Sequence, residues 1–134
     1  MDDFRQVICC NKVAKLFEII KYDISQFIEA WLQSEVNRQI IEYEPAVVSQ
    51  GVLYWKELFS EEYPNMSIKE GTANPDAKFW IGYILTYMQY TYHLTGEEIW
   101  NRYNILDALD MYDVLHTQSS KIACEDIMKN YIKE

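Results

Sequence analysis

The sequence has little glycine and no concentration of positive charge. Its four glycines, Gly51, Gly71, Gly82 and Gly96, stand apart from one another in 134 residues. Phosphate-binding loops need closely spaced glycines, so the GxGxxG and P-loop modes of nucleotide binding are excluded. The twelve Lys and Arg residues are scattered along a chain whose net charge is -9. Because nucleic-acid affinity depends on clustered basic side chains, we expect neither a DNA nor an RNA partner.

Cysteine is also scarce. The three cysteines are Cys9, Cys10 and Cys124, an odd number without CxxC or Cys/His ligand spacing. A disulfide framework would need an even number of cysteines spread along the chain, so reduced thiols and a cytoplasmic location are predicted. All three lie among apolar residues, which favours inert buried thiols over a Cys/His nucleophile.

Long hydrophobic runs are absent as well. The chain opens with acidic Met1-Asp2-Asp3, where an export signal would be basic. The most apolar window, residues 79–94, is too short for a bilayer core and contains Thr86, Gln89 and Thr91. We therefore expect neither an export signal nor a membrane-spanning segment.

What the chain does have is enough apolar surface for a single folded domain. Of its residues 49% are hydrophobic and 15% aromatic, which excludes disorder of the whole chain. Apolar side chains recur at helical three-four spacing, first over residues 3–21, and no strand alternation persists. The sequence predicts a compact all-α bundle of about six helices, with an N-terminal half at 1–64, a loop at 65–74 and a C-terminal half at 75–134.

The second half is predicted to begin with a long aromatic helix at the core. Asn74, Pro75 and Asp76 form a helix start, with a cap, a proline at the first turn and a carboxylate near the positive helix end. Apolar side chains then surround most of the helix axis, which is typical of a buried central helix. Aromatic side chains are also favoured anchors of interfaces, so the same helix is open to an interface role. Its two aromatic and apolar stripes contain Phe79, Trp80, Tyr83, Ile84, Tyr87, Met88 and Tyr90.

Four polar residues recur at every third position near the C-terminal end. They are Asp107, Asp110, Asp113 and His116. On one helical flank, carboxylates near an imidazole are candidates for binding a divalent metal or for acid–base chemistry. The same pattern is more often a solvated helix face whose carboxylates cap helix starts. The sequence thus predicts no metal, no cofactor and no catalytic residue.

A polar turn follows, Leu115-His116-Thr117-Gln118. In a structural interpretation the turn caps and orients the last helix. In a functional one it presents His116 and Gln118 to a partner, since polar turns on rigid scaffolds are common contact sites.

Three short segments together resemble a known family. They are Phe79-Trp80-Ile81-Gly82-Tyr83, Leu94-Thr95-Gly96-Glu97-Glu98-Ile99 and Leu115-His116-Thr117-Gln118, followed by Glu125-Asp126-Ile127. Their order is similar to that in small uncharacterised bacterial helical proteins with a Leu-His-Thr-Gln motif, over about residues 77–132. Members of that family tend to be encoded beside proteins that resemble ADP-ribosyltransferase toxins. The resemblance implies an antitoxin-like or accessory role.

Taken together, these patterns predict a protein-binding module that is not an enzyme. Its candidate partner-binding residues are Asp107, Asp110, Asp113, His116 and Gln118. Two alternatives remain: a small metal-dependent or acid–base enzyme that uses Asp110, Asp113 and His116, and a phage or mobile-element protein that forms homo-oligomers through its aromatic surface.

Overall fold

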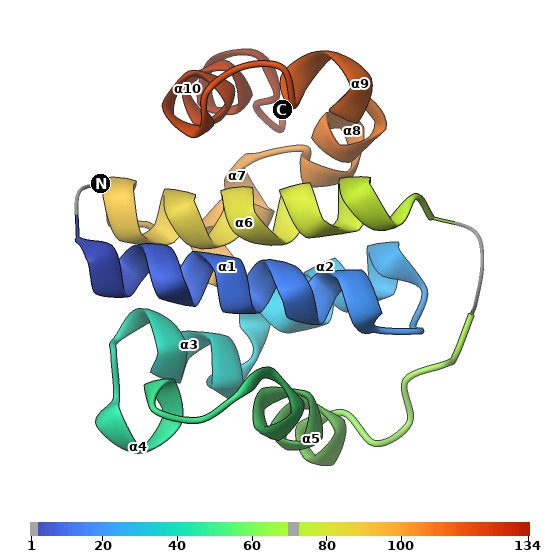
Figure 1. The fold of residues 1–134 in the computed structure, drawn as a ribbon. Helices are drawn as coiled ribbons and strands as arrows, with labels where there is room; N and C mark the ends of the chain where they lie inside the picture. Colours follow the sequence, from blue (N-terminus) through green and yellow to red (C-terminus); the bar gives the residue numbers. More distant parts are fainter. Residues whose placement is uncertain (1–2, 70–72) are drawn as a thin grey trace.

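The computed structural model describes residues 3–69 and 73–134, and within these ranges it confirms the all-α prediction. Ten helices form there, together with two isolated β-bridges and no strand (Figure 1). The helices are α1 (Phe4–Ile19), α2 (Ile24–Gln33), α3 (Glu35–Ile41), α4 (Pro45–Val48), α5 (Val52–Glu62), α6 (Pro75–Tyr92), α7 (Gly96–Arg102), α8 (Ile105–Asp110), α9 (Tyr112–Leu115) and α10 (Ser120–Asn130).

The helices of the described residues are more numerous than the predicted six because short breaks divide several of them. Ser34 adopts an extended backbone, ends α2 and caps α3 by accepting a hydrogen bond from the Asn37 amide at 3.1 Å. Tyr43 has a positive φ of 58°, a left-handed conformation that ends helical winding. Met111 separates α8 from α9. Each break leaves the three-four spacing of apolar residues nearly intact, so spacing alone does not reveal it.

Helices α1 and α6 lie side by side along most of their length (Figure 1). Gly82 makes this approach possible, because a Cβ at that position would lie 2.7 Å from Cγ of Phe17 and 3.1 Å from the Ala14 backbone. One turn earlier in α6, Lys78 Nζ donates to the carbonyl of Ile20, just past the end of α1, at 2.8 Å. The two helices are therefore antiparallel neighbours in close backbone contact.

An aromatic cluster fills the core between α1, α2 and α5. The Phe27 ring centroid lies 4.8 Å from that of Phe17 and 4.9 Å from that of Phe59, both in edge-to-face geometry. Trp31 adds an edge contact with Phe17 at 5.8 Å. Such ring pairs are each worth about 0.5–1.5 kcal/mol beyond the area they bury. These contacts join the N-terminal helices into one core.

Helix α6 is buried along its later turns and only partly buried at its start. Tyr87 and Tyr90 are buried, and the Tyr90 hydroxyl donates to the Ile40 carbonyl at 2.7 Å. Phe79, Trp80 and Tyr83, in the first turns, are only partly buried. The aromatic residues of this helix thus divide between the core and the surface.

The C-terminal helices α8, α9 and α10 cover the side of α6 that faces away from α1 (Figure 1). Cys124 of α10 contacts the Ile84 carbonyl of α6 at an Sγ–O distance of 4.0 Å. The chain end is held by an isolated bridge between Tyr103 and Ile132 and by a hydrogen bond from the Asn104 amide to the Tyr131 carbonyl at 2.7 Å.

The predicted loop at 65–74 is described only in part, because residues 70–72 lie outside the described ranges. Ile68 forms an isolated bridge with Tyr22, and the Lys69 amide donates to the Lys21 carbonyl at 2.7 Å. This part of the loop is therefore tied to the link between α1 and α2. Among the described residues, no helix combines the length and the apolar character needed to cross a membrane.

Candidate functional site

The four residues spaced by three do not share one continuous helix. Asp107 and Asp110 belong to α8, Asp113 belongs to α9, and His116 caps the end of α9. All four are exposed. The helix break at Met111 interrupts the flank that the sequence pattern predicts.

The His116 ring is held by Tyr112. Its Nδ1 lies 2.7 Å from the Tyr112 carbonyl oxygen, and the two rings stack with centroids 4.4 Å apart at an interplanar angle of 19°. A carbonyl only accepts, so Nδ1 donates its proton in this contact. Within the described part of the chain, none of the three aspartates forms a hydrogen bond to His116. An aspartate–histidine acid–base pair is therefore not assembled here.

A metal site is not assembled at this position either. Among residues 3–69 and 73–134, no group of three or more His, Cys, Asp or Glu side chains is arranged to hold a metal ion. The described residues therefore supply no set of metal ligands for the alternative hypothesis of a metal-dependent enzyme.

The three aspartates share the lack of an ion pair within the described residues with other exposed carboxylates, such as Glu57 and Glu61. Seven carboxylates of the described residues form ion pairs, for example Glu98 with Arg102 at 2.7 Å. Asp107, Asp110 and Asp113 form none with the described residues. We call these three side chains the acidic flank.

Gln118, the last candidate residue, is turned inward. Its Oε1 is buried and has no hydrogen-bond partner within the described residues. The backbone amide of Gln118 closes the turn by donating to the Leu115 carbonyl at 3.2 Å, and Ser119 caps α10 by accepting from the Ile122 amide at 3.3 Å. The cap of α10 is thus Ser119, the residue after the turn, whereas the Thr117 hydroxyl donates to the Val114 carbonyl at 2.7 Å.

A groove of about 480 Å³ lies beside this turn, between α1, α6 and α9. We call it the aromatic groove. It joins His116, from the sequence motif, to the partly exposed aromatic start of α6. Its lining comprises Asn11, Glu18, Asp76, Phe79, Trp80, Tyr83, Tyr112 and His116. Partial burial raises the pKa of Tyr83 above its ordinary value.

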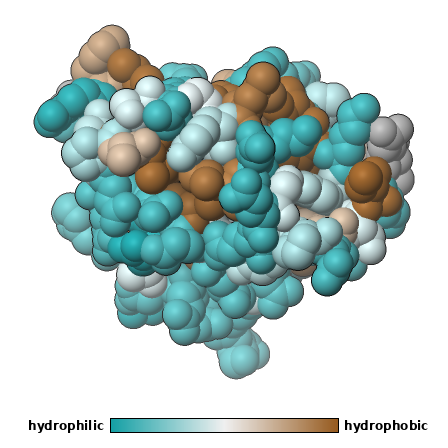
Figure 2. Space-filling view, turned by 90° about the horizontal axis from the view of Figure 1, so that it is seen from below, coloured by the Kyte–Doolittle hydropathy of each residue, from teal (hydrophilic) through white to brown (hydrophobic). Residues whose placement is uncertain are grey.

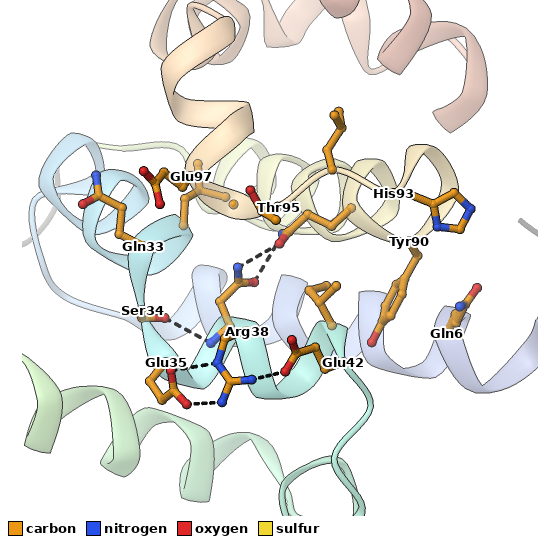
Figure 3. Close-up of a pocket in the computed structure, with 16 residues that line it drawn as sticks. Gln6, Gln33, Ser34, Glu35, Arg38, Glu42, Tyr90, His93, Thr95 and Glu97 are labelled. Carbon is orange, nitrogen blue, oxygen red and sulfur yellow. Dashed lines mark hydrogen bonds and ion pairs between the residues drawn. The ribbon is translucent and has the colours of Figure 1, made fainter.

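A second cavity, of about 490 Å³, lies between α3 and the turn that joins α6 to α7 (Figure 3). Beneath it, the side-chain amides of Asn37 and Gln89 bond reciprocally, with Nδ2–Oε1 at 2.8 Å and Nε2–Oδ1 at 3.2 Å. At its edge Arg38 lies between Glu35 and Glu42 and pairs with both (Figure 3). The hydrogen bond from Arg38 holds the pKa of Glu35 below its ordinary value.

Several polar groups of this cavity are paired with one another. The guanidinium is shared among three glutamates, including Glu44 at 3.5 Å, and the two amides satisfy each other. The Thr95 cap also exchanges bonds with Glu98, at 3.0 Å in both directions. Figure 3 shows Arg38 turned toward Glu35 and Glu42, whereas Gln6, Gln33, His93 and Glu97 of the lining have no interaction drawn to the other lining residues.

Exposed apolar residues are spread over the surface. The face seen in Figure 2 shows apolar groups in several places, separated by hydrophilic side chains. Among the described residues, the large apolar side chains that are exposed are Phe4, Ile8, Leu53, Tyr54, Ile68, Met111, Val114, Ile122 and Ile132. This distribution gives little support to a homo-oligomer built on one large aromatic surface.

The three thiols are buried and free. Burial raises the pKa of Cys10 to about 12 and also raises the pKa values of Cys9 and Cys124. A protonated, inaccessible thiol is a poor nucleophile. The geometry therefore agrees with the structural interpretation of these cysteines.

Sequence reasoning missed the aromatic groove. Its residues come from three segments that are distant along the chain, and only the four-residue spacing of Tyr112 and His116 signals that two of them lie on one helical face. The α6 residues of the groove, Phe79, Trp80 and Tyr83, were predicted mainly to belong to the hydrophobic core.

Comparison with protein-family models, with curated proteins and with solved structures gives no match for this chain.

Proposed function

We propose that this chain is a non-catalytic protein-binding module that acts in the cytoplasm. It binds and restrains a toxin-like enzyme whose gene lies beside its own. The observation that supports the proposal is the acidic flank. Three exposed carboxylates lie on two short helices without an ion-pair partner in the described residues. Carboxylates in that state are available to basic groups of a partner surface.

The flank is also held firmly in place. Ile105, Ala108 and Leu115, from the same two helices, are buried in the core. The start of α8 is joined to the chain end by the hydrogen bond between Asn104 and Tyr131. A rigid contact surface loses little conformational entropy on binding.

The overall charge supports the same kind of partner. A net charge of -9 attracts a basic surface and raises the rate at which it is encountered. A basic cleft that faces NAD or nucleic acid would be covered by such a surface. The family resemblance favours a toxin-like enzyme as the protein that contains this cleft.

Co-expression tests the proposal. The tagged chain is produced with each protein encoded by a flanking reading frame, and both co-purification and growth are scored. We expect one neighbour to slow growth when produced alone, and to co-purify and become harmless in the presence of the chain. If no neighbour is toxic and none binds, the proposal is wrong.

A further inference from the structure

Tryptophan rings in this molecule are repeatedly covered by cations. Lys12 Nζ lies 4.4 Å from the ring centroid of Trp55, and Lys133 Nζ lies 4.4 Å from that of Trp100. Trp80 is different: it is partly exposed, and no Lys or Arg of the described residues lies over its ring. Trp80 therefore combines partial exposure with a ring that no cation of the described residues occupies.

Trp80 does not stand alone in the aromatic groove. Its ring meets that of Tyr112 edge-on, with centroids 5.7 Å apart at 66°, and Tyr112 in turn stacks on His116. Phe79 and Tyr83 extend the lining along α6. Aromatic faces carry negative potential and attract a cation placed over them, more strongly when water is partly excluded.

The charge at the edge of the groove has the complementary sign. Glu18 is paired with Lys15 at 2.6 Å. Burial lowers the pKa of the nearby Lys78, and the charge of Glu18 opposes that shift. Asp76 is exposed and forms no ion pair with any described residue. Apart from His116, the charged side chains that line the groove are Glu18 and Asp76, and both are carboxylates.

Hydrogen-bond acceptors are present as well. His116 uses Nδ1 toward the Tyr112 carbonyl, which leaves Nε2 as the remaining acceptor of the neutral ring. Asn11 uses its amide nitrogen toward the Val7 carbonyl at 3.1 Å, and its Oδ1 accepts no hydrogen bond from the described residues. A guanidinium is planar, stacks on aromatic faces and carries five donors, whereas an ammonium is compact and more strongly hydrated.

We propose that the aromatic groove binds an arginine side chain of the partner protein, with the guanidinium over the Trp80 ring and within reach of the Asp76 carboxylate. The inference rests on the proposed function, because it supplies that function with a specific contact. It adds an anchor on α1 and α6, next to the acidic flank, because Tyr112 and His116 of the groove lie beside Asp113 in the chain. Aromatic and arginine side chains are the residue types that most often dominate interface affinity.

The probe is the peptide Ac-Gly-Arg-Gly-NH2, titrated into the full chain while the indole N–H signals are followed by NMR. The control peptide carries citrulline, which keeps the planar shape and lacks the charge. We expect the arginine peptide to shift the Trp80 signal in a saturable way and to leave Trp100 unmoved. The citrulline peptide should bind at least fivefold more weakly than the arginine peptide. Equal binding of the two peptides, or absence of any Trp80 shift, would overturn the inference.

Variants locate the contact. Asp76→Asn keeps an exposed polar residue in the first turn of α6 and should weaken arginine-peptide binding about threefold. Trp80→Leu should weaken it at least tenfold, whereas Trp100→Leu, at a ring already covered by Lys133, should change it less than twofold. Circular dichroism shows whether each variant is folded. Unchanged binding in folded Asp76→Asn and Trp80→Leu would contradict the assignment.

The same variants separate this inference from the proposed function. If a toxic neighbour binds the chain and Trp80→Leu binds it equally well, the groove is not an anchor, although the module function stands. If the arginine peptide binds at Trp80 while no neighbouring protein binds, the groove assignment stands and the proposed function is wrong.

Discussion

At the scale of single residues, Asn37 and Gln89 form a buried contact that can be tested. Each is only 2% exposed, and their amides satisfy each other between α3 and α6. Replacing Asn37 by Ala leaves Gln89 Oε1 without its donor, which should lower the free energy of unfolding by about 1–3 kcal/mol.

A double-mutant cycle measures this coupling. Urea unfolding of Asn37→Ala, Gln89→Ala and the double variant should show that the double variant loses less than the sum of the two single losses. Strictly additive losses would mean that the two amides do not depend on each other.

Gly96 permits a close approach of α7 to the end of α2. A Cβ on Gly96 would lie 1.9 Å from the Leu32 carbonyl oxygen and 2.8 Å from Asn37 Nδ2. Gly96→Ala should therefore lower the free energy of unfolding by about 1–3 kcal/mol or more, because backbone must move to make room. Urea unfolding measures the loss.

Gly51→Ala is the matched control, since a Cβ there would meet nothing within 4 Å and its φ is -92°. We expect this substitution to change the free energy of unfolding by less than about 1 kcal/mol. Similar losses at Gly51 and Gly96 would show that steric contact is not the cause.

At the scale of the elements, the start of α2 should make stability depend on pH. Asp23 caps this helix by accepting hydrogen bonds from the Ser25 hydroxyl, the Ser25 amide and the Gln26 amide, and it also pairs with Lys69. These contacts, with the Ser25 side-chain bond first, lower its pKa from 3.8 to about 2.

The lowered pKa fixes the direction of the effect. The ionised cap stabilises the fold fully above the unfolded pKa of 3.8, and this stabilisation is lost as the pH falls toward about 2. The wild type should thus exceed Asp23→Asn in stability at pH 6, and the gap should shrink between pH 4 and pH 2. Thermal unfolding of both proteins across this range measures it. A gap that stays constant with pH would contradict the assignment.

The elements also show how far sequence reasoning reaches. The cap at Asn74 and the capping box at Thr95 and Glu98 are local signals, and both are present: Asn74 accepts from the Asp76 amide at 2.9 Å. The start of α6 is therefore predictable to the residue. The break at Met111 cannot be predicted in this way, because the sequence has no Gly or Pro there and the Met111 side chain makes no capping hydrogen bond.

The candidate site was predictable only in part, for the same reason. The pattern of Asp107, Asp110 and Asp113 indicates an exposed acidic face, and all three are exposed. The three aspartates do not share one continuous helix with His116, because the helix breaks at Met111. The aromatic groove depends on the antiparallel contact of α1 and α6, which sequence spacing does not encode.

At the scale of the whole molecule, the account describes an acidic helical protein with two separate contact features. One is the acidic flank, and the other is the aromatic groove, which is lined in part by Tyr112 and His116. Both are suited to basic groups of a partner. A complex formed in this way should weaken as salt is added, because exposed charge pairs are screened.

The central claim is that the acidic flank, and not net charge alone, binds the partner. Isothermal calorimetry with the partner identified by co-expression compares the wild type with the triple variant Asp107→Asn, Asp110→Asn, Asp113→Asn. Three lost charge pairs of about 0.5–1 kcal/mol each amount to an affinity roughly ten- to a hundredfold weaker.

The matched control is the triple variant Glu29→Gln, Glu57→Gln, Glu61→Gln. It removes the same charge at three exposed glutamates of α2 and α5 that form no ion pair with described residues. We predict a dissociation constant at least tenfold higher for the flank variant and within twofold of wild type for the control. Equal effects of the two variants, or no effect of either, would contradict the account.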